Sequence, residues 1–159
     1  MPLFSALVRR PAEPVDVRAA ALAGLAAGAA YLVEMVVDLR LSGRNVDDLH
    51  FLGGALGAEP RVARRLGFAI HVVNSIALAV GYARLAEPRL GGPGWRRGVV
   101  FASAENVVLY PLTALEGMHP AIRAGRLDRY FTWPAFLLSV PRHIAYGAVL
   151  GGLYERLRR

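Results

Sequence analysis

The sequence contains no cysteine and no lysine, and only 19% of its 159 residues are charged. Without cysteine, a disulfide framework, a thiolate metal site and a cysteine nucleophile are all excluded. The low charge and the hydrophobic share of 55% together exclude an intrinsically disordered chain. All 19 basic residues are arginine and the net charge is +7. The length leaves room for one domain of ordinary size.

The hydrophobic residues gather in four blocks, each long enough to cross a bilayer, which takes about 20 mostly apolar residues. The blocks cover residues 17–39, 66–86, 98–118 and 134–155. They are apolar nearly all round, whereas a helix of a soluble protein carries a polar stripe every three or four residues. We therefore predict an all-α fold, a four-helix transmembrane bundle made by a single membrane domain over residues 17–159, after a mobile tail over residues 1–16.

The segments between and before these blocks add further expectations. Asn45 followed by two aspartates is typical of a helix cap and predicts a short interfacial helix over residues 46–56, with an irregular loop as the alternative. Arg9 and Arg10 before an alanine-rich run resemble a cleaved signal peptide. The length of the first apolar block instead favours an uncleaved membrane anchor.

The positive charge is spread over both ends of the predicted helices. With both termini on one side, that side carries ten arginines and the other eight, which favours cytoplasmic termini. Such a distribution suits anionic lipid headgroups, and no pattern of basic and stacking aromatic residues points to nucleic acid. We expect the lipid bilayer as the main partner and no nucleic acid. A homo-oligomer and a partner in a membrane complex both stay open.

Several polar side chains fall inside the predicted spans. A charge in hydrocarbon costs at least about 2.5 kcal/mol, so such groups normally face the bundle interior and pair. The candidate ligand-binding cluster consists of Glu34, His71, Asn74, Glu105, Asn106, Arg142 and His143. We expect Arg142 to pair with Glu34 or Glu105, because a guanidinium can hold a carboxylate with two N–H donors.

Three roles are open for this cluster: interhelical packing, a site for a small ligand, ion or proton, and a cofactor site. In the third, His71 and His143 are candidate axial ligands of haem b. Alternatively, Glu34, Glu105 and the same two histidines could hold iron, zinc or manganese. We commit to no metal site.

Since no nucleophile elbow, phosphate-binding loop or dinucleotide fingerprint is present, an enzyme is not favoured.

Two further histidines, His50 and His119, lie between the predicted spans. We expect both at the headgroup level, as solvated loop histidines.

The chain shows signs of an internal repeat. With an offset of 72 residues, His71 aligns with His143 and Tyr82 with Tyr154. This suggests two repeated helical hairpins, and coincidence in a low-complexity apolar sequence is the alternative.

Small residues are spaced for close helix packing in the first and fourth spans. The patterns Gly24-x-x-x-Gly28 and Gly147-x-x-x-Gly151 predict a close contact between these two spans, because missing side chains let helix backbones approach.

The polar and glycine positions together resemble those of uncharacterised small four-span integral membrane proteins of bacteria. The residues that carry this resemblance are His71-x-x-Asn74, Glu105-Asn106 with Pro111, His119-Pro120, and Arg142-His143 with Gly147 and Gly151. The resemblance implies a multi-pass protein of the bacterial inner membrane and brings no established activity. Three hypotheses follow: a membrane protein of unknown role whose cluster binds a small ligand or proton, a haem- or metal-binding redox component, and an accessory or assembly subunit of a membrane complex.

Overall fold

The structure is a computed structural model that describes residues 14–57 and 59–158. The predicted mobile tail falls almost entirely on residues 1–13, outside the described residues. The described residues form helices and no strand. Four helical segments are long and apolar enough to cross a membrane, namely Val17–Ser42, Pro60–Ala86, Gly94–Met118 and Trp133–Leu157. The predicted all-α fold with four apolar helices is confirmed.

Each long segment extends beyond the apolar block that predicted it. The bounds are α1 Val17–Ser42, α3 Pro60–Gly81 continued by the π-helix η2 Tyr82–Ala86, α4 Gly94–Leu109 continued by the 3-10 helix η3 Tyr110–Met118, and α6 Trp133–Leu157. α3 starts at Pro60, six residues before the predicted start at residue 66. The prediction missed its first turns because Arg61, Arg64 and Arg65 make them polar. Hydropathy locates the apolar middle of a membrane-spanning helix, but it does not detect the polar ends of that helix.

Two short helices, α2 Asp48–Gly54 and α5 Pro120–Arg123, lie in the first and third loops. α2 is shorter than predicted, and its cap is Asp47, whose Oδ1 accepts hydrogen bonds from two backbone N–H groups at 3.0 and 3.1 Å. The predicted cap residue Asn45 instead donates from its side chain to the carbonyl of Arg126 at 2.7 Å. Asn45 therefore connects the first loop to the third.

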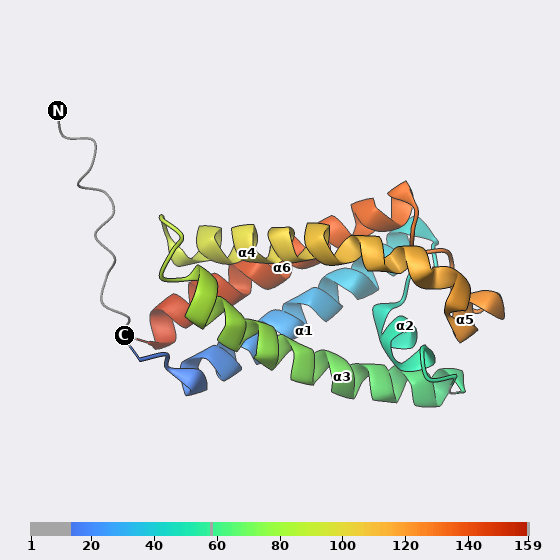
Figure 1. Ribbon diagram of the computed structural model, residues 1–159, viewed down its shortest axis with the longest axis horizontal. Coiled ribbons are helices and arrows are strands. Elements are labelled where there is room, and N and C mark those ends of the chain that lie inside the picture. Colours follow the sequence, from blue (N-terminus) through green and yellow to red (C-terminus); the bar gives the residue numbers. More distant parts are fainter. Residues whose placement is uncertain (1–13, 58, 159) are drawn as a thin grey trace.

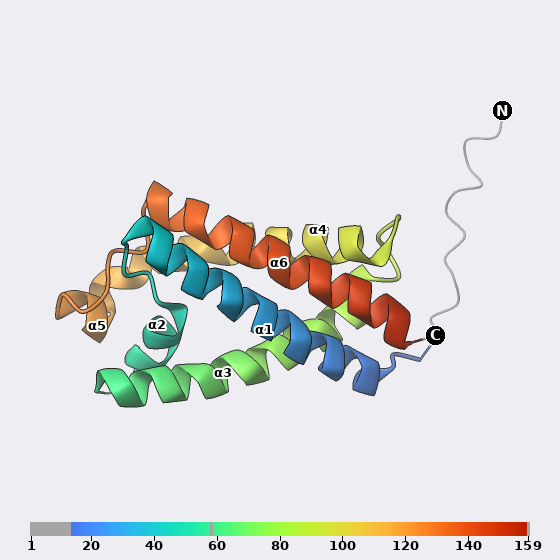
Figure 2. The ribbon, with the colours of Figure 1, turned by 180° about the vertical axis from the view of Figure 1, so that it is seen from behind.

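The long helices pack in the order α4, α6, α1 and α3 (Figures 1 and 2). α6 contacts both α4 and α1, and α1 contacts α3. Both views show α3 and α4 diverging from the turn that connects them, with α2 beside α3 at the far end. Near this turn α4 contacts η2, and α3 and α4 are not among the main contacting pairs of helices.

Glycines bring two helix pairs close together, and these are not the predicted pairs. A Cβ on Gly24 or Gly28 would collide with α3, whereas one on Gly147 or Gly151 would collide with the backbone of α4. α1 and α6 do pack on each other, but their glycine motifs face α3 and α4. The predicted contact between the first and fourth spans is confirmed, but the glycine motifs do not form it, because small residues on α3 and α4 supply the surfaces that face these glycines.

The two close contacts are related along the chain. Ser75 and Ala79, which face the α1 glycines, lie 72 residues before Gly147 and Gly151, which face α4. The same offset aligned the histidines in the sequence. This correspondence favours two related hairpins, α1–α3 and α4–α6, and the duplication itself stays a prediction.

Candidate functional site

Arg142 of α6 is one of the most buried side chains in the described part of the chain, with 2% of its surface exposed. Its Nε and Nη2 donate to both carboxylate oxygens of Asp38, at 2.5 and 2.6 Å. Its Nη1 donates to Asp48 Oδ2 at 2.5 Å and to the Val46 carbonyl at 3.0 Å. In this arrangement protein oxygens replace the water molecules that would accept hydrogen bonds from an exposed guanidinium, which offsets the cost of burying its charge. We call Arg142, Asp38 and Asp48 the arginine cluster.

The expected pairing of Arg142 with Glu34 or Glu105 is therefore wrong. Asp38 lies one helical turn after Glu34 on α1 and is buried, and it takes the place expected for the glutamate. Glu34 is half-buried and has no ion pair within the described residues. Asp48 was missed because it stands outside the apolar blocks, on α2, and only the tertiary fold brings α2 into the bundle.

Glu105 pairs instead with His143, with Oε2 and Nε2 3.2 Å apart. The His143 Nδ1 lies 2.7 Å from the Ser139 carbonyl, which can only accept, so Nδ1 carries a hydrogen. A favourable contact between Nε2 and Oε2 then needs one more proton, on the ring or on the carboxyl group.

Tyr31 of α1 connects this pair to the arginine cluster. Its hydroxyl donates to Asp48 Oδ2 at 2.7 Å. Its ring centre lies 5.4 Å from that of His71 and 5.2 Å from that of His143. His71 is buried, and its Nε2 donates to the Gly28 carbonyl at 3.1 Å. The second predicted amide, Asn106, donates to Ser139 Oγ at 2.9 Å.

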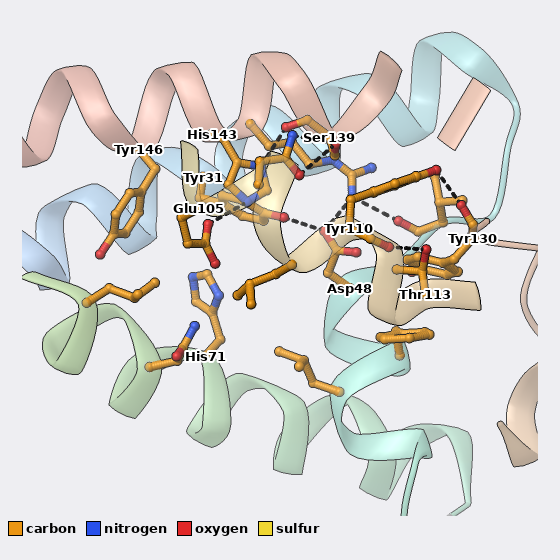
Figure 3. A pocket seen from close by; sticks show the side chains of 18 of the residues that line it. Tyr31, Asp48, His71, Glu105, Tyr110, Thr113, Tyr130, Ser139, His143 and Tyr146 are labelled. Atoms are coloured by element: carbon orange, nitrogen blue, oxygen red, sulfur yellow. Dashed lines mark hydrogen bonds and ion pairs between the residues drawn. The ribbon is translucent and has the colours of Figure 1, made fainter. Parts of the chain in front are cut away.

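These side chains surround a cavity of about 240 Å³. Figure 3 shows the Glu105 carboxyl group and the His71 ring pointing toward each other in it. Six of the seven predicted cluster residues line the cavity, and Glu34 does not. The polar lining residues that the sequence prediction left out are Tyr31, Asp48, Ser75, Tyr110, Thr113, Tyr130, Ser139 and Tyr146. Apart from Asp48, these residues have neutral hydroxyl groups, which change the hydropathy of a span very little. Only their position on a common helical face could have indicated them.

The cavity opens to one side of the bundle. Of its lining residues, Asn74 of α3 and Leu109 of α4 are exposed. These two residues mark the mouth of the cavity, which lies between the two helices that diverge in Figure 1. The mouth therefore lies on the outer surface of the helical bundle.

The geometry does not fit the haem or metal hypotheses. Both nitrogens of His143 have protein partners, and the Tyr31 ring packs against both candidate histidines. His71 and His143 therefore do not present two free nitrogens to one iron, as a b-type haem requires. Within residues 14–57 and 59–158, no group of three or more histidine, aspartate and glutamate side chains is placed to hold a metal ion.

His50 and His119 are buried, with 4% and 8% of their surfaces exposed, so the expectation of solvated loop histidines is wrong. The His119 ring stacks on Phe51 with ring centres 4.5 Å apart, and its Nε2 donates to the Phe51 carbonyl at 2.8 Å. Burial lowers the pKa of His50, which is partly offset by the nearby carboxylate of Asp47. Both rings therefore belong to the packing between α2 and the third loop.

The lowered pKa of His50 predicts a specific pH dependence of stability. The unfolded chain takes up a proton on this ring as the pH falls through about 6.5, whereas the folded protein takes it up only at a lower pH. The unfolded state then binds more protons, so stability falls toward acid pH. In His50→Gln, the difference in melting temperature between pH 7.5 and pH 5.5 should be smaller than in the wild type. An equal difference in the two proteins would contradict this assignment.

A second ion-pair group lies at the opposite end of the bundle and connects the α3–α4 turn to α6. Arg97 donates to Glu87 at 2.7 Å and to Glu155 at 2.9 Å. Arg158 donates to the same Glu87 oxygen at 2.6 Å. The carboxylates and guanidiniums balance in charge, and we assign this group a structural role.

Comparison with known proteins identifies the family of the chain. A search of curated proteins and a search of solved structures each found no match. Residues 14–159 match a family described as "Family of unknown function (DUF6789)". This match covers all four long helices and the cavity. The chain therefore belongs to the DUF6789 family, whose function is unknown.

Proposed function

We propose that this protein is a multi-pass membrane protein that binds a small ligand in the cavity between α3 and α4. The observation that carries the proposal is a partly polar cavity among apolar helices, with its mouth on the outer surface of the bundle. With the four helices in a membrane, this mouth would face lipid. Binding pockets for small molecules are concave and mostly apolar, with a few convergent polar groups. The volume of about 240 Å³ suits a small molecule or the polar end of a larger one.

Interhelical packing alone does not account for the polar groups of the cavity. A side chain kept only for packing would have its hydrogen bonds satisfied by other helices, as in the Asn106–Ser139 pair. In contrast, His71 Nδ1, Glu105 Oε1 and Asp48 Oδ1 have no hydrogen-bond partner within the described residues. None of these three atoms is among the fully buried side-chain atoms without a partner, and their residues line the cavity, so they face its open space. We infer that a ligand in the cavity supplies their hydrogen bonds.

We further propose that the protein resides in a bacterial inner membrane with both termini in the cytoplasm. The resemblance to four-span bacterial proteins and the slight excess of arginine on the side of the termini support this orientation. A second copy of the chain and a membrane-complex partner remain open as binding partners. No observation favours the redox hypothesis over ligand binding.

A matched pair of tryptophan substitutions tests the cavity. Asn74→Trp places a large ring at the mouth, whereas Val73→Trp places the same ring on the next residue, which is 68% exposed and does not line the cavity. Small molecules retained by each variant in mild detergent are measured by native mass spectrometry.

The wild type and Val73→Trp are expected to retain a bound small molecule, and Asn74→Trp is expected to lose most of it. Equal retention in all three proteins would contradict binding in this cavity. The absence of any retained molecule, together with no binding of added small molecules, would contradict the proposed function.

A further inference from the structure

The arginine cluster carries an excess of negative charge. Asp38 and Asp48 supply two carboxylates, and Arg142 supplies one guanidinium. The neighbouring Glu105–His143 pair is neutral overall when it holds its proton. One negative charge is therefore uncompensated among apolar helices, where an unpaired charge is expensive.

The side of this cluster that faces the cavity is rich in hydrogen-bond acceptors. Asp48 and Glu105 each have a carboxylate oxygen without a partner within the described residues, and both line the cavity. The His71 ring is more than nine-tenths buried. Because its Nε2 donates to a carbonyl, its Nδ1 is an acceptor in the neutral ring.

Tyrosine rings complete the surroundings of these acceptors. Tyr31, Tyr110 and Tyr146 line the cavity, and Figure 3 shows them around the two carboxylates. Aromatic ring faces attract cations electrostatically. Negative charge, free acceptors and aromatic rings all favour a cation that donates hydrogen bonds.

We propose that the cavity binds a primary ammonium group. This inference rests on the proposed function and names the class of its ligand. A primary ammonium brings one positive charge and three N–H donors, which match the excess charge and the free acceptor atoms. A metal ion fits less well, because no three suitable ligands are grouped within the described residues. An anion would be repelled by the uncompensated negative charge.

The ammonium group has two possible sources. A free small amine supplies it from water, and a phospholipid with an ethanolamine headgroup supplies it from the bilayer. The mouth between α3 and α4 gives the lipid a direct route, because the acyl chains stay outside while the headgroup enters. Both sources present the same chemical group to Glu105 and Asp48.

Binding is tested on the full chain in phosphatidylcholine nanodiscs. Ethylammonium is titrated and followed by calorimetry, with tetramethylammonium as a cation that has no N–H donor. A separate preparation in an equimolar mixture of phosphatidylcholine and phosphatidylethanolamine tests the lipid source, read out as co-purified phosphatidylethanolamine. Glu105→Gln removes a cavity carboxylate, and Glu34→Gln removes a span carboxylate that does not line the cavity.

Ethylammonium or phosphatidylethanolamine is expected to bind the wild type and Glu34→Gln, with at least tenfold weaker binding to Glu105→Gln. Binding of the free amine assigns a soluble source, and retention of the lipid alone assigns the bilayer source. Equal binding of tetramethylammonium would overturn the hydrogen-bonding part of the inference. Retention of a molecule without an amine would overturn the whole inference and leave the proposed function standing.

A measurement on the wild type alone covers the case in which Glu105→Gln does not fold. With tyrosine selectively labelled, ethylammonium or the ethanolamine headgroup should give nuclear Overhauser contacts to the cavity tyrosines, Tyr31 and Tyr146. Contacts restricted to tyrosines outside the cavity, such as Tyr154, would overturn the inference.

Discussion

Arg142→Met is expected to destabilise the folded protein by about 3–5 kcal/mol, the cost of removing one partner of a buried ion pair. Methionine fills much of the arginine volume but leaves Asp38 and Asp48 without their shared cation. The loss of three donor groups also leaves carboxylate oxygens without hydrogen bonds inside the bundle. The effect should appear as a large drop in stability during reversible unfolding in mixed micelles.

The matched control is Arg64→Met. Arg64 also pairs with an aspartate, Asp47, at 2.7 Å, but 59% of its side chain is exposed, and exposed pairs contribute roughly 0–1 kcal/mol. The triple variant Arg142→Met, Asp38→Asn, Asp48→Asn should recover most of the lost stability, because no buried charge stays unpaired. Equal stability of Arg142→Met and the wild type would show that the arginine cluster does not form.

Gly151→Ala is expected to be the second severe substitution, although it adds a single methyl group. The new Cβ would lie inside van der Waals distance of the Gly94 carbonyl on α4. Since this contact is with backbone, α4 must move away from α6. Overpacking typically costs about 1–3 kcal/mol, and a rigid backbone contact places this variant at the upper end.

The neighbouring residue provides the control. A Cβ on Gly152 would meet only the Trp95 Cβ, at an ordinary 3.8 Å. Alanine is a better helix former than glycine by roughly 0.5–1 kcal/mol, so Gly152→Ala should match or exceed wild-type stability. Melting temperatures in the same detergent decide the comparison. Similar losses in both variants would contradict the close α4–α6 packing.

The sequence predicts the long helices well because their signal is local. Apolar runs of bilayer length need no knowledge of neighbours. The start of α6 is equally local: the Thr132 side chain accepts from the N–H of Ala135, and a proline follows in the first turn, both common at helix starts. The helix ends were less accurate, because arginine-rich turns continue the helix beyond the apolar run.

Part of the cavity lining was predictable from the sequence, but the ion pairs were not. A charge inside an apolar span must face inward, and this argument placed Glu105, Arg142 and His143 in the site. It could not choose between Glu34 and Asp38, which share one helical face, because helix rotation is set by packing. The role of Asp48 could not be predicted from the sequence, since its position depends on how the first loop folds into the bundle.

The central claim is that lipid surrounds these helices while their polar side chains face inward. Because the chain has no cysteine, Val73→Cys, Val107→Cys and Arg123→Cys each provide a single position for a spin label in reconstituted bilayers. The first two positions are exposed on α3 and α4, and the third is exposed in the third loop.

Collisions of these labels with oxygen and with a water-soluble nickel chelate, measured by electron paramagnetic resonance, are the most direct test. Labels at positions 73 and 107 should collide mainly with oxygen, which concentrates in the acyl region, whereas the label at position 123 should collide mainly with the chelate. Chelate collisions at positions 73 and 107 as frequent as at position 123 would contradict the membrane-spanning arrangement.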